Sequence, residues 1–299
     1  MSESDSAEEI QKKWNSFYRF DPVTTREIRR SFLQDEYLNP ILPITLEDAF
    51  SLAVTRKKKF YYESSESDKG WFFGSGFKDR KNFGKLMDLQ FEEFLKRKVK
   101  TVYYSNVLPD YLMPGVDAIR YRSLARELGK LGFIPHEEAI SMEAEIGKMQ
   151  YLEIEPSEFE VSSLRQGEET DFLSFVEKNF NSDCYYRAKG VAERGIKDQV
   201  VIARIGRRIV GYGMFSAGRG DMWYSPGERF GPFGVEDKER SKGIGALILA
   251  QLLNNMKGLG LKHAYFLWTS ERATHLYSRF GFKVTRRFTI MKKDLLKPR

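Results

Sequence analysis

Apolar runs with the length of strands recur through the second half of the chain. Residues 199–204 and 208–215 are two such runs joined at Gly206, the pattern of a strand hairpin. Residues 231–235 and 263–268 are two further runs with the character of buried strands. Both lie close to glycine-rich turns, and together the runs predict a sheet in this half of the chain.

Helical spacing separates these runs. Apolar residues recur every three or four positions from Gly243 to about Met256, which predicts a helix between the strands at 231–235 and 263–268. Earlier in this half we expect a strand at 159–164 and helices at 168–180 and 185–194. Strands that alternate with helices predict a fold of the α/β (α+β) class, with a mixed twisted sheet flanked by helices.

The first half has a similar but less regular pattern. Aromatic and apolar residues at 10–37 predict one or two helices. Residues 45–54 resemble a capped helix, because Thr45 can cap its start and Asp48 follows three positions later. Residues 59–63 and 70–74 then predict two strands.

This half also repeats the second half without a gap over a helix and a strand. When Gly84 is placed on Gly245, Leu86 falls on Leu247 and Tyr104 falls on Tyr265. Gly132 and Phe133 meet Gly281 and Phe282 at a smaller offset, so the first copy carries an insertion around residues 112–117. A repeat of this length predicts two duplicated domains.

Composition narrows the class of protein. The chain has 299 residues, 41% of them hydrophobic, which is enough for real cores. Its one cysteine, Cys184, excludes an internal disulfide, and we expect no metal site because no ligands have metal-binding spacing. The absence of a long apolar run and of a signal peptide leads us to expect a cytoplasmic protein with no membrane partner.

The net charge of +7 is unevenly distributed. Residues from 151 onward contain 25 Lys and Arg against 18 Asp and Glu, whereas residues 1–150 contain 24 of each. An excess of positive charge in the second half fits a polyanionic ligand. The basic residues are scattered among acidic ones, which disfavours nucleic acid as a partner.

The glycine-rich turn before the predicted helix offers a site for such an anion. Gly243 and Gly245 follow Arg240, Ser241 and Lys242 at the point where the helix begins. The start of a helix presents free backbone N–H groups and a positive dipole end, and glycine lets a bulky anion approach closely. The turn lacks the Gly-Lys-Ser/Thr of a Walker loop and the three glycines of a dinucleotide fingerprint.

Arg240-x-x-Gly243-x-Gly245, placed after a strand that ends in Val235, resembles the acetyl-CoA pyrophosphate loop of the GNAT N-acetyltransferases. Downstream, Ala273-x-x-x-Tyr277-x-x-x-Gly281-Phe282 is similar to a second segment of that family. The resemblance covers about residues 155–295. It implies acetyl-CoA as cofactor and direct acetyl transfer to a primary amine in a ternary complex.

The resemblance also implies site residues. Those implied for CoA are Phe233, Gly234 and Val235 on a distorted strand, Arg240, Ser241, Lys242, Gly243, Ile244, Gly245 and Ala246 in the loop and helix start, and Ser270 and Arg279 near the second segment. It implies that Tyr277 protonates the leaving thiolate.

The general base stays open in the sequence. Glu228 is our candidate, and Asp221, Glu236 and a chain of water molecules are alternatives. His263 and His275 are weaker alternatives. The loop at 218–229 is long for a hairpin and carries Trp223 and Tyr224, which either stack on a ligand or pack, as does Trp268.

The first copy lacks the residues that the resemblance assigns to phosphate binding and to proton donation. Asp79 stands where the second copy has Arg240, Asn82 stands at Gly243, and Leu128 replaces Tyr277. A carboxylate beside a pyrophosphate is repulsive, and Asn82 restores a Cβ where close approach is needed. The chain therefore resembles tandem GNAT proteins with a degenerate first copy.

The sequence thus predicts a partly helical extension at 1–40, a degenerate GNAT-like domain at 41–147 and an acetyl-CoA-binding GNAT domain at 155–299. We expect an N-acetyltransferase that acts on a small-molecule or peptide amine, either as a monomeric pseudo-dimer or as a homodimer. The alternatives are a non-catalytic acyl-CoA sensor or scaffold and a basic nucleic-acid-associated module.

Overall fold

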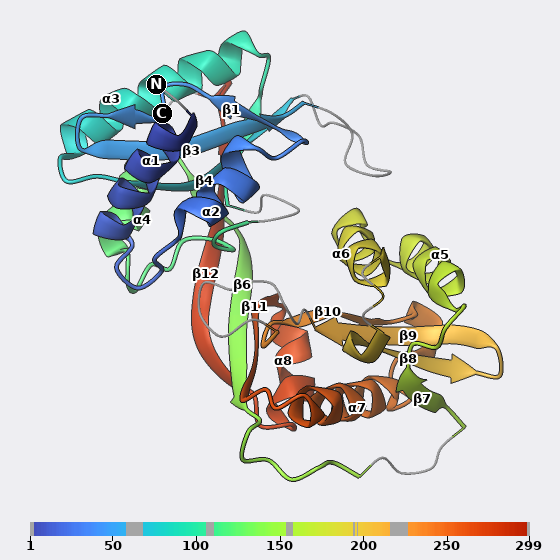
Figure 1. Ribbon diagram of the computed structural model, residues 1–299. Coiled ribbons are helices and arrows are strands. Elements are labelled where there is room, and N and C mark those ends of the chain that lie inside the picture. The colour runs from blue at the N-terminus through green and yellow to red at the C-terminus, as the bar shows by residue number, and fades with distance from the viewer. Residues whose placement is uncertain are drawn as a thin grey trace. The chain divides into compact units, whose positions relative to one another are not determined.

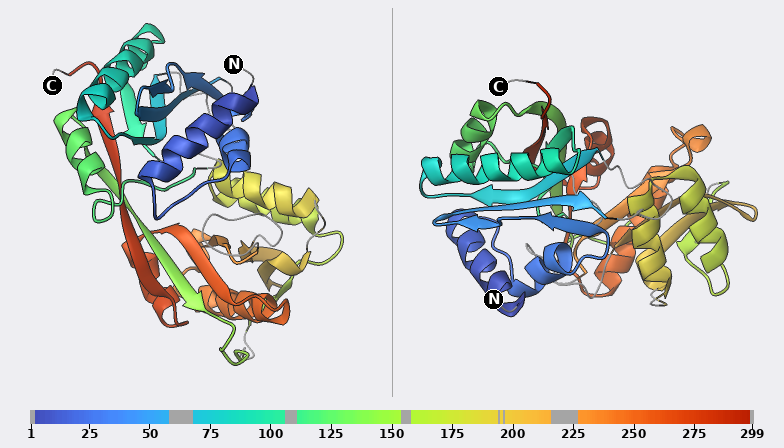
Figure 2. Two further views of the ribbon diagram at one scale, coloured as in Figure 1. Left: turned by 60° about the vertical axis from the view of Figure 1, so that its left-hand side comes forward. Right: turned by 90° about the horizontal axis from the view of Figure 1, so that it is seen from above.

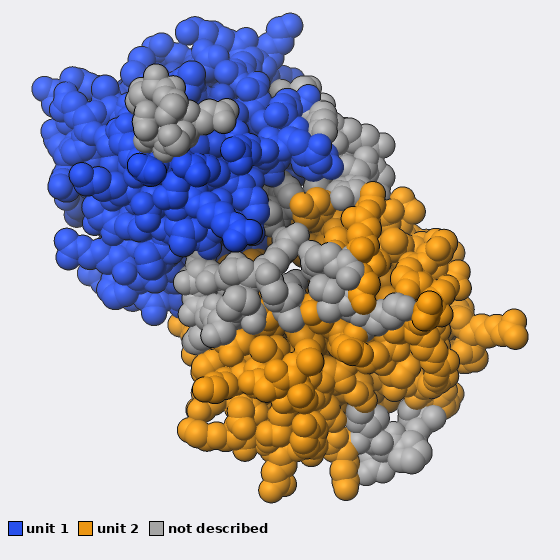
Figure 3. Space-filling model, viewed as in Figure 1, with its two compact units in different colours: residues 1–139, 286–299 blue, residues 140–285 orange. Residues whose placement is uncertain are grey.

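A computed structural model describes residues 3–57, 68–105, 111–153, 158–193, 195, 197–215 and 227–297 (Figure 1). The chain forms two compact units, which Figure 3 shows in different colours. Unit 1 comprises residues 1–139 and 286–299, and unit 2 comprises residues 140–285. No helix in the described part of the chain is long and apolar enough to cross a membrane.

Unit 1 is a sheet with helices on both of its faces. Its helices are α1 (Glu3–Phe17), α2 (Thr25–Ile28), which continues into one π-helical turn (Arg29–Leu33), α3 (Arg80–Lys96) and α4 (Arg122–Lys130). Its strands are β1 (Leu38–Ile41), β2 (Thr45–Leu46), β3 (Ala49–Arg56), β4 (Lys69–Gly76) and β5 (Thr101–Tyr104). In the right-hand view of Figure 2, α1 and α3 cover opposite faces of the sheet. The helices predicted at 10–37 are confirmed by α1 and α2.

The helix predicted at 45–54 is wrong, because these residues form β2 and β3. Every residue from Ala49 to Val54 is buried, as in a central strand with a helix on each face. Such a strand has no alternation to distinguish it from a buried helix. Asp48 instead lies beside the start of α3, where its carboxylate accepts from the N–H of the N-cap residue Asp79 at 2.8 Å.

Unit 2 has the order of elements that the sequence predicted. Its strands are β7 (Glu160–Ser163), β8 (Val200–Ile205), β9 (Arg208–Phe215), β10 (Phe230–Val235) and β11 (His263–Thr269). Its helices are α5 (Glu169–Asn179), α6 (Ser182–Glu193), α7 (Ile244–Gly258) and α8 (Glu271–Ser278), with single 3-10 turns at Lys197–Gln199 and Asp237–Glu239. The strands and helices predicted for residues 159–268 are confirmed to within a few residues.

The sheet β10-β9-β8-β7 separates two hydrophobic cores. On one face α5 and α6 pack against residues such as Ile202 and Tyr212, and on the other face α7 packs against Val201 and Val210 (Figure 1). Alternate residues of β8 and β9 therefore point to opposite faces, as strand geometry requires.

Two long strands run from one unit into the other. They are β6 (Ile134–Glu145), which starts in unit 1, and β12 (Lys283–Asp294), which starts in unit 2. Within unit 1 the end of β12 pairs with β5, with Met291 opposite Tyr104. Within unit 2 the end of β6 pairs with β11, with Met142 opposite Phe266. The last strand of each sequence copy thus pairs with a strand of the other copy, and β6, β11 and β12 belong to one eight-stranded sheet with β1 to β5.

The two copies share a detailed helix ending. Gly132 after α4 and Gly281 after α8 both have left-handed backbones, with φ of 85° and 80°. The following Phe133 and Phe282 donate their N–H groups to the carbonyls of Leu128 and Tyr277, at 3.0 and 3.2 Å. This is the glycine-based helix termination in which the second residue past the helix bonds back into its last turn. The repeated Gly-Phe pair of the sequence therefore marks the same local structure twice.

Candidate active site

The site is organised around two strands that meet at one end and then separate. The N–H of Tyr265 on β11 donates to the carbonyl of Glu228 at 3.0 Å, and Arg229 and Tyr265 form an isolated parallel bridge. Beyond this point β10 pairs with β9 alone among the described strands. The register of β10 shifts between Phe230 and Phe233. The edge of Phe233, Gly234 and Val235 that faces away from β9 is therefore open to an extended ligand, which can bind there as an added strand.

The turn after β10, residues 236–243, is called the phosphate loop below. Gly243 occupies the N-cap of α7 with φ 84° and ψ −9°, a left-handed conformation that glycine adopts without strain. Ser241 is also left-handed, with φ 67°, which a serine rarely adopts. A Cβ at Gly243 would meet no atom within 4 Å, so the backbone at this position faces open space.

The N-terminus of α7 has unpaired donors. Ala246 and Leu247 donate their N–H groups to the carbonyl of Gly243, at 2.9 and 3.3 Å. The hydrogen bonds of the described residues give no acceptor for the N–H groups of Lys242, Gly243, Ile244 and Gly245. These donors and the positive end of the α7 dipole form a site suited to a phosphate group. The predicted loop residues are thus brought together at one helix end.

The basic side chains of the phosphate loop have carboxylate neighbours. Arg240 contacts Asp237 at 2.6 Å and donates to the carbonyl of Val235 at 3.1 Å. Lys242 contacts Glu239 at 2.8 Å. Because Arg240 is half-exposed and its partner Asp237 is 83% exposed, an anion at the helix end can compete for Arg240 at little cost.

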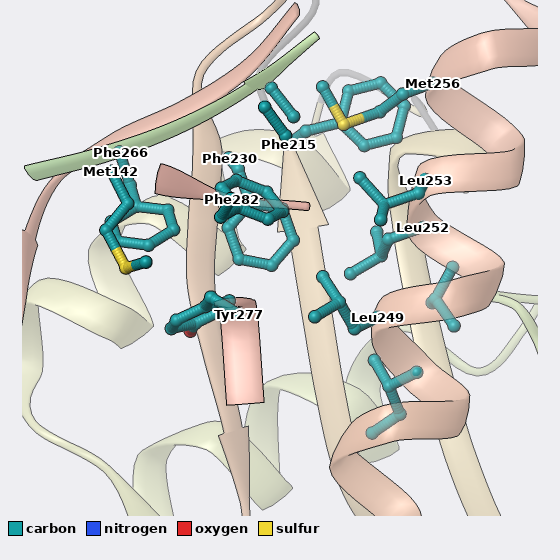
Figure 4. Close-up of a cluster of buried hydrophobic side chains, with 14 of the residues drawn as sticks. Met142, Phe215, Phe230, Leu249, Leu252, Leu253, Met256, Phe266, Tyr277 and Phe282 are labelled. Carbon is teal, nitrogen blue, oxygen red and sulfur yellow. The ribbon is translucent and has the colours of Figure 1, made fainter. Parts of the chain in front are cut away.

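Tyr277 on α8 lies in an aromatic cluster. Its ring centroid is 4.6 Å from that of Phe266, 5.6 Å from Phe282, 5.8 Å from Phe230 and 6.0 Å from Phe233. Figure 4 shows Phe230, Phe266, Tyr277 and Phe282 gathered on one side of the unit 2 core. Only 7% of Tyr277 is exposed.

The Tyr277 hydroxyl is an unpaired donor. Among the described residues it has no hydrogen-bond partner, and burial raises the pKa of Tyr277 well above the usual tyrosine value. The phenol is protonated at neutral pH, as tyrosines are, and no described group accepts its proton, so a leaving group that reached the hydroxyl could receive it.

The phenylalanine at position 233 connects this cluster to the phosphate loop. A Cβ on Gly245 would lie 3.4 Å from the Phe233 ring and 3.3 Å from the side chain of Leu276, the residue before Tyr277. Gly245 therefore lies directly against a ring of the aromatic cluster. The helix end and the Tyr277 helix are direct neighbours, as one ligand that reaches both requires.

Glu228 lies where β10 and β11 meet. Its side chain is only 4% exposed, and Oε1 accepts from the backbone N–H groups of Lys262 and His263 at 3.1 and 3.2 Å. Oε2 lies 3.3 Å from Nδ1 of His263. Two of the predicted candidates for the base, Glu228 and His263, are thus in contact. The carboxylate also anchors the start of β11.

The other candidates lie apart from this pair or outside the description. Glu236 contacts Lys238 at 3.1 Å and also pairs with Arg208. His275 is exposed on α8, and Ser270 and Arg279 are exposed at the two ends of that helix. Asp221, Trp223 and Tyr224 lie outside the described residues. The side chain of Arg208 contacts the phosphate loop from the start of β9. The sequence did not predict this contact, because Arg208 lies 28 residues before Glu236.

Comparisons with known proteins agree with this geometry. Residues 197–284 match the family model described as an acetyltransferase (GNAT) domain. The chain matches none of the curated proteins.

Solved structures with the same fold cover almost the whole chain. One is a GCN5-related glucosamine N-acetyltransferase region of a fungal multi-domain GH3 β-N-acetylglucosaminidase, with a TM-score of 0.74, 15% identity and 98% of this chain covered; this chain spans 37% of that protein. A GCN5-related N-acetyltransferase from Sphaerobacter thermophilus has a TM-score of 0.66 at 16% identity, with 98% of this chain and 92% of that one covered.

A tandem GNAT protein from the clavulanic acid biosynthesis pathway has a TM-score of 0.67 at 10% identity, with 100% of this chain and 97% of that one covered. At these identities the likeness shows the fold. Residues 197–284 thus match a GNAT acetyltransferase domain, and the whole chain has the fold of solved GNAT structures, one of which is a tandem GNAT protein.

Proposed function

We propose that unit 2 is an acetyl-CoA-dependent N-acetyltransferase that transfers the acetyl group directly to a primary amine. The observation that supports this most is the juxtaposition of two unpaired donors, the N–H groups at the start of α7 and the Tyr277 hydroxyl. Gly245, at the start of α7, and the ring of Tyr277 both lie close to the ring of Phe233, which belongs to the strand with the open edge.

Each group of the site has a role in this proposal. The phosphate loop and the α7 N-terminus bind the pyrophosphate, and the open edge of Phe233 to Val235 binds the pantetheine by main-chain hydrogen bonds. The acetyl thioester is the donor that CoA supplies. Ser270 and Arg279, at the ends of α8, are proposed as outer contacts to the same ligand.

Two residues are proposed to handle protons. The amine attacks the thioester carbonyl carbon, a C–N bond forms and the C–S bond breaks. Tyr277 delivers its hydroxyl proton to the departing sulfur, and Glu228 receives the proton that the amine loses. Glu228 is favoured over Glu236 because Glu236 is held by Arg208 and Lys238, outside the strand junction.

The test is an acceptor screen with labelled acetyl-CoA. Amino sugars come first, because a protein with the same fold is a glucosamine N-acetyltransferase, followed by polyamines, amino acids and peptide N-termini. With the acceptor found, Tyr277→Phe should lower kcat by about 10²–10⁴, the usual worth of a positioned general acid. The affinity for acetyl-CoA should stay within a few fold, because the ring and the phosphate loop are retained.

Ser278→Ala is the matched control, since it removes a hydroxyl from the adjacent, exposed residue of the same helix. It should leave both constants unchanged. Retention of CoA without transfer to any amine would instead identify a binding protein. A Tyr277→Phe variant with the wild-type rate would refute the acid role and leave the cofactor assignment standing.

A further inference from the structure

The phosphate loop contains a carboxylate that its motif does not require. The side chain of Glu239 is 8% exposed, whereas that of Asp237 in the same loop is 83% exposed. Both oxygens of Glu239 are bonded: Oε1 accepts from Arg208 at 2.5 Å, and Oε2 accepts from Lys242 at 2.8 Å. These contacts lower the pKa of Glu239, with Lys242 as the largest cause, so the carboxylate stays ionised.

The two cations that hold Glu239 come from different parts of unit 2. Lys242 belongs to the phosphate loop, while Arg208 is the first residue of β9. Arg208 also donates to Glu236 at the beginning of the loop. One guanidinium therefore bridges the two ends of the Glu236–Glu239 turn and ties it to the strand next to β10.

The backbone beside Lys242 explains why such a tie is needed. Ser241 and Gly243, on either side of Lys242, both have left-handed backbones, with φ of 67° and 84°. A serine in this region is strained, and strained backbone persists only where its surroundings fix it. The contact of Lys242 with Glu239 lies between these two residues and can fix them.

We propose that Glu239 is a positioning residue that, through Arg208 and Lys242, holds the phosphate loop in the conformation that exposes the α7 N–H groups. This inference rests on the proposed binding of CoA by that loop. By charge alone, a carboxylate beside a polyanion weakens binding, so its removal should strengthen binding. By positioning, its removal should weaken binding. The two accounts predict opposite signs.

The experiment compares two substitutions that remove the same charge from the same loop. Calorimetry with CoA should show Glu239→Gln binding about tenfold more weakly than the wild type, the loss expected when charge-assisted hydrogen bonds are broken. Asp237→Asn removes an exposed partner of Arg240, and its affinity should equal or exceed that of the wild type. In the transfer assay Glu239→Gln should raise KM for acetyl-CoA with little change in kcat.

Arg208 provides the rescue. Arg208→Ala should reproduce the loss of CoA affinity, and Arg208→Lys should restore part of it because an ammonium can still reach one oxygen of Glu239. A Glu239→Gln variant that binds CoA as tightly as the wild type, or more tightly, would overturn the proposal.

Hydrogen exchange on the free protein separates this proposal from the cofactor assignment. In Glu239→Gln the backbone amides at positions 239, 240, 246 and 247, which are hydrogen-bonded within the loop and to the carbonyl of Gly243, should exchange faster than in the wild type, while those of α5 should not change. If the wild type failed to bind CoA, the proposed function would fall. Unchanged exchange at these four amides would overturn the positioning role whatever the ligand.

Discussion

Helices α3 and α7 follow the corresponding strands of the two copies, yet their N-termini differ in one decisive respect. The start of α7 is preceded by Arg240, Ser241, Lys242 and Gly243, and its first N–H groups have no acceptor among the described residues. The start of α3 is filled by the protein's own acidic groups. Asp79 accepts from the N–H of Lys81 at 2.9 Å.

Two further carboxylates lie at the N-terminus of α3. The side chain of Asn82 donates to Glu47 at 2.7 Å and to Asp48 at 3.1 Å. These bonds lower the pKa of Asp48, with Asn82 as the largest cause, so the group stays ionised. In unit 1 the positive end of the helix dipole is thus neutralised internally, whereas in unit 2 it is left for a ligand.

The helix boundary differs as well. In the alignment of the two copies, Lys81 and Asn82 correspond to Lys242 and Gly243. In unit 1 these residues already belong to α3, which begins at Arg80, but in unit 2 they precede α7. The first copy has lost the phosphate loop because its residues have become the first turn of a helix.

The strand junctions show the same contrast. In unit 1, β4 and β5 pair in parallel up to Phe72 opposite Tyr104, and Ser105 continues with an N–H bond to Phe72. In unit 2, β10 and β11 meet at Arg229 and Tyr265 and then separate. Among the described residues the pairing of β4 with β5 thus extends over four residues, whereas β10 and β11 share a single bridge.

The comparison predicts the largest loss of CoA affinity when a negative charge is placed at the N-terminus of α7. Gly243→Asp should abolish detectable CoA binding, because it puts a carboxylate at the unpaired N–H groups. Gly243→Asn isolates the effect of the charge, since asparagine has nearly the same size as aspartate and tolerates a left-handed backbone equally well. It should retain weakened binding by calorimetry.

The corresponding change in unit 1 should act on stability instead. Asn82→Asp adds a carboxylate beside Glu47 and Asp48 and removes two hydrogen bonds. We expect a lower melting temperature and unchanged CoA affinity. Equal CoA binding by Gly243→Asp and Asn82→Asp would show that the helix end of α7 is not the site.

The next effect concerns buried charge, which in unit 1 holds the fold together. Arg286 on β12 pairs with Asp21 and contacts Asp117 at 2.8 Å, and all three are buried. Arg286→Ala removes the buried cation from both carboxylates, leaving Asp21 with Tyr121 and Asp117 with Arg120, and should cost about 3 kcal/mol of unfolding free energy. Urea unfolding followed by tryptophan fluorescence measures this, since Trp14 donates to the carbonyl of Asp21.

Arg287 is the matched control on the same strand. Its pair with Glu138 is 2.7 Å long, but both side chains are about half-exposed. Arg287→Ala should therefore cost less than about 1 kcal/mol. Similar costs for the two variants would show that the Asp21–Arg286–Asp117 cluster contributes no more than a surface pair.

The strands and helices of unit 2 could be predicted from sequence because they rest on local patterns. Glycine at 243, and the repeat of Gly132-Phe133 in Gly281-Phe282, correspond to left-handed backbone conformations that the structure contains. Asp79 and Asn82 indicated the loss of a phosphate site. They did not indicate that the loop had become helix, because polar residues suit a loop and a first helical turn equally well.

What could not be predicted depends on partners far away in the chain. Residues 49–54 are buried on both faces, so their pattern does not distinguish strand from helix. The pairing of β12 with β5 joins residues almost 190 positions apart, and no local pattern encodes it. The contact of Glu239 with Arg208 depends in the same way on the β8–β9 hairpin folding beside the phosphate loop.

A smaller effect is expected from the cap of α3. Asp79→Ala removes the side chain that bonds the N–H of Lys81, which should cost about 1 kcal/mol of stability. Glu92→Ala removes a charge from an exposed position inside the same helix and should change stability by less than about 0.5 kcal/mol. Urea denaturation of both variants gives the comparison. Equal values would mean that the carboxylate of Asp79 is not an effective cap.

The smallest effect should come from an attempt to open the α3 end. The double variant Asp48→Asn, Asp79→Asn removes two carboxylates from the helix start while keeping side chains that can accept hydrogen bonds. If the negative charge of these carboxylates were the only reason that unit 1 does not bind CoA, this variant would bind a second CoA. We expect the stoichiometry by calorimetry to stay at one per chain, because α3 still begins at Arg80 and β4 still pairs with β5 up to Phe72. A second equivalent of CoA that persisted in the Gly243→Asp background would show that backbone geometry is not what separates the two copies.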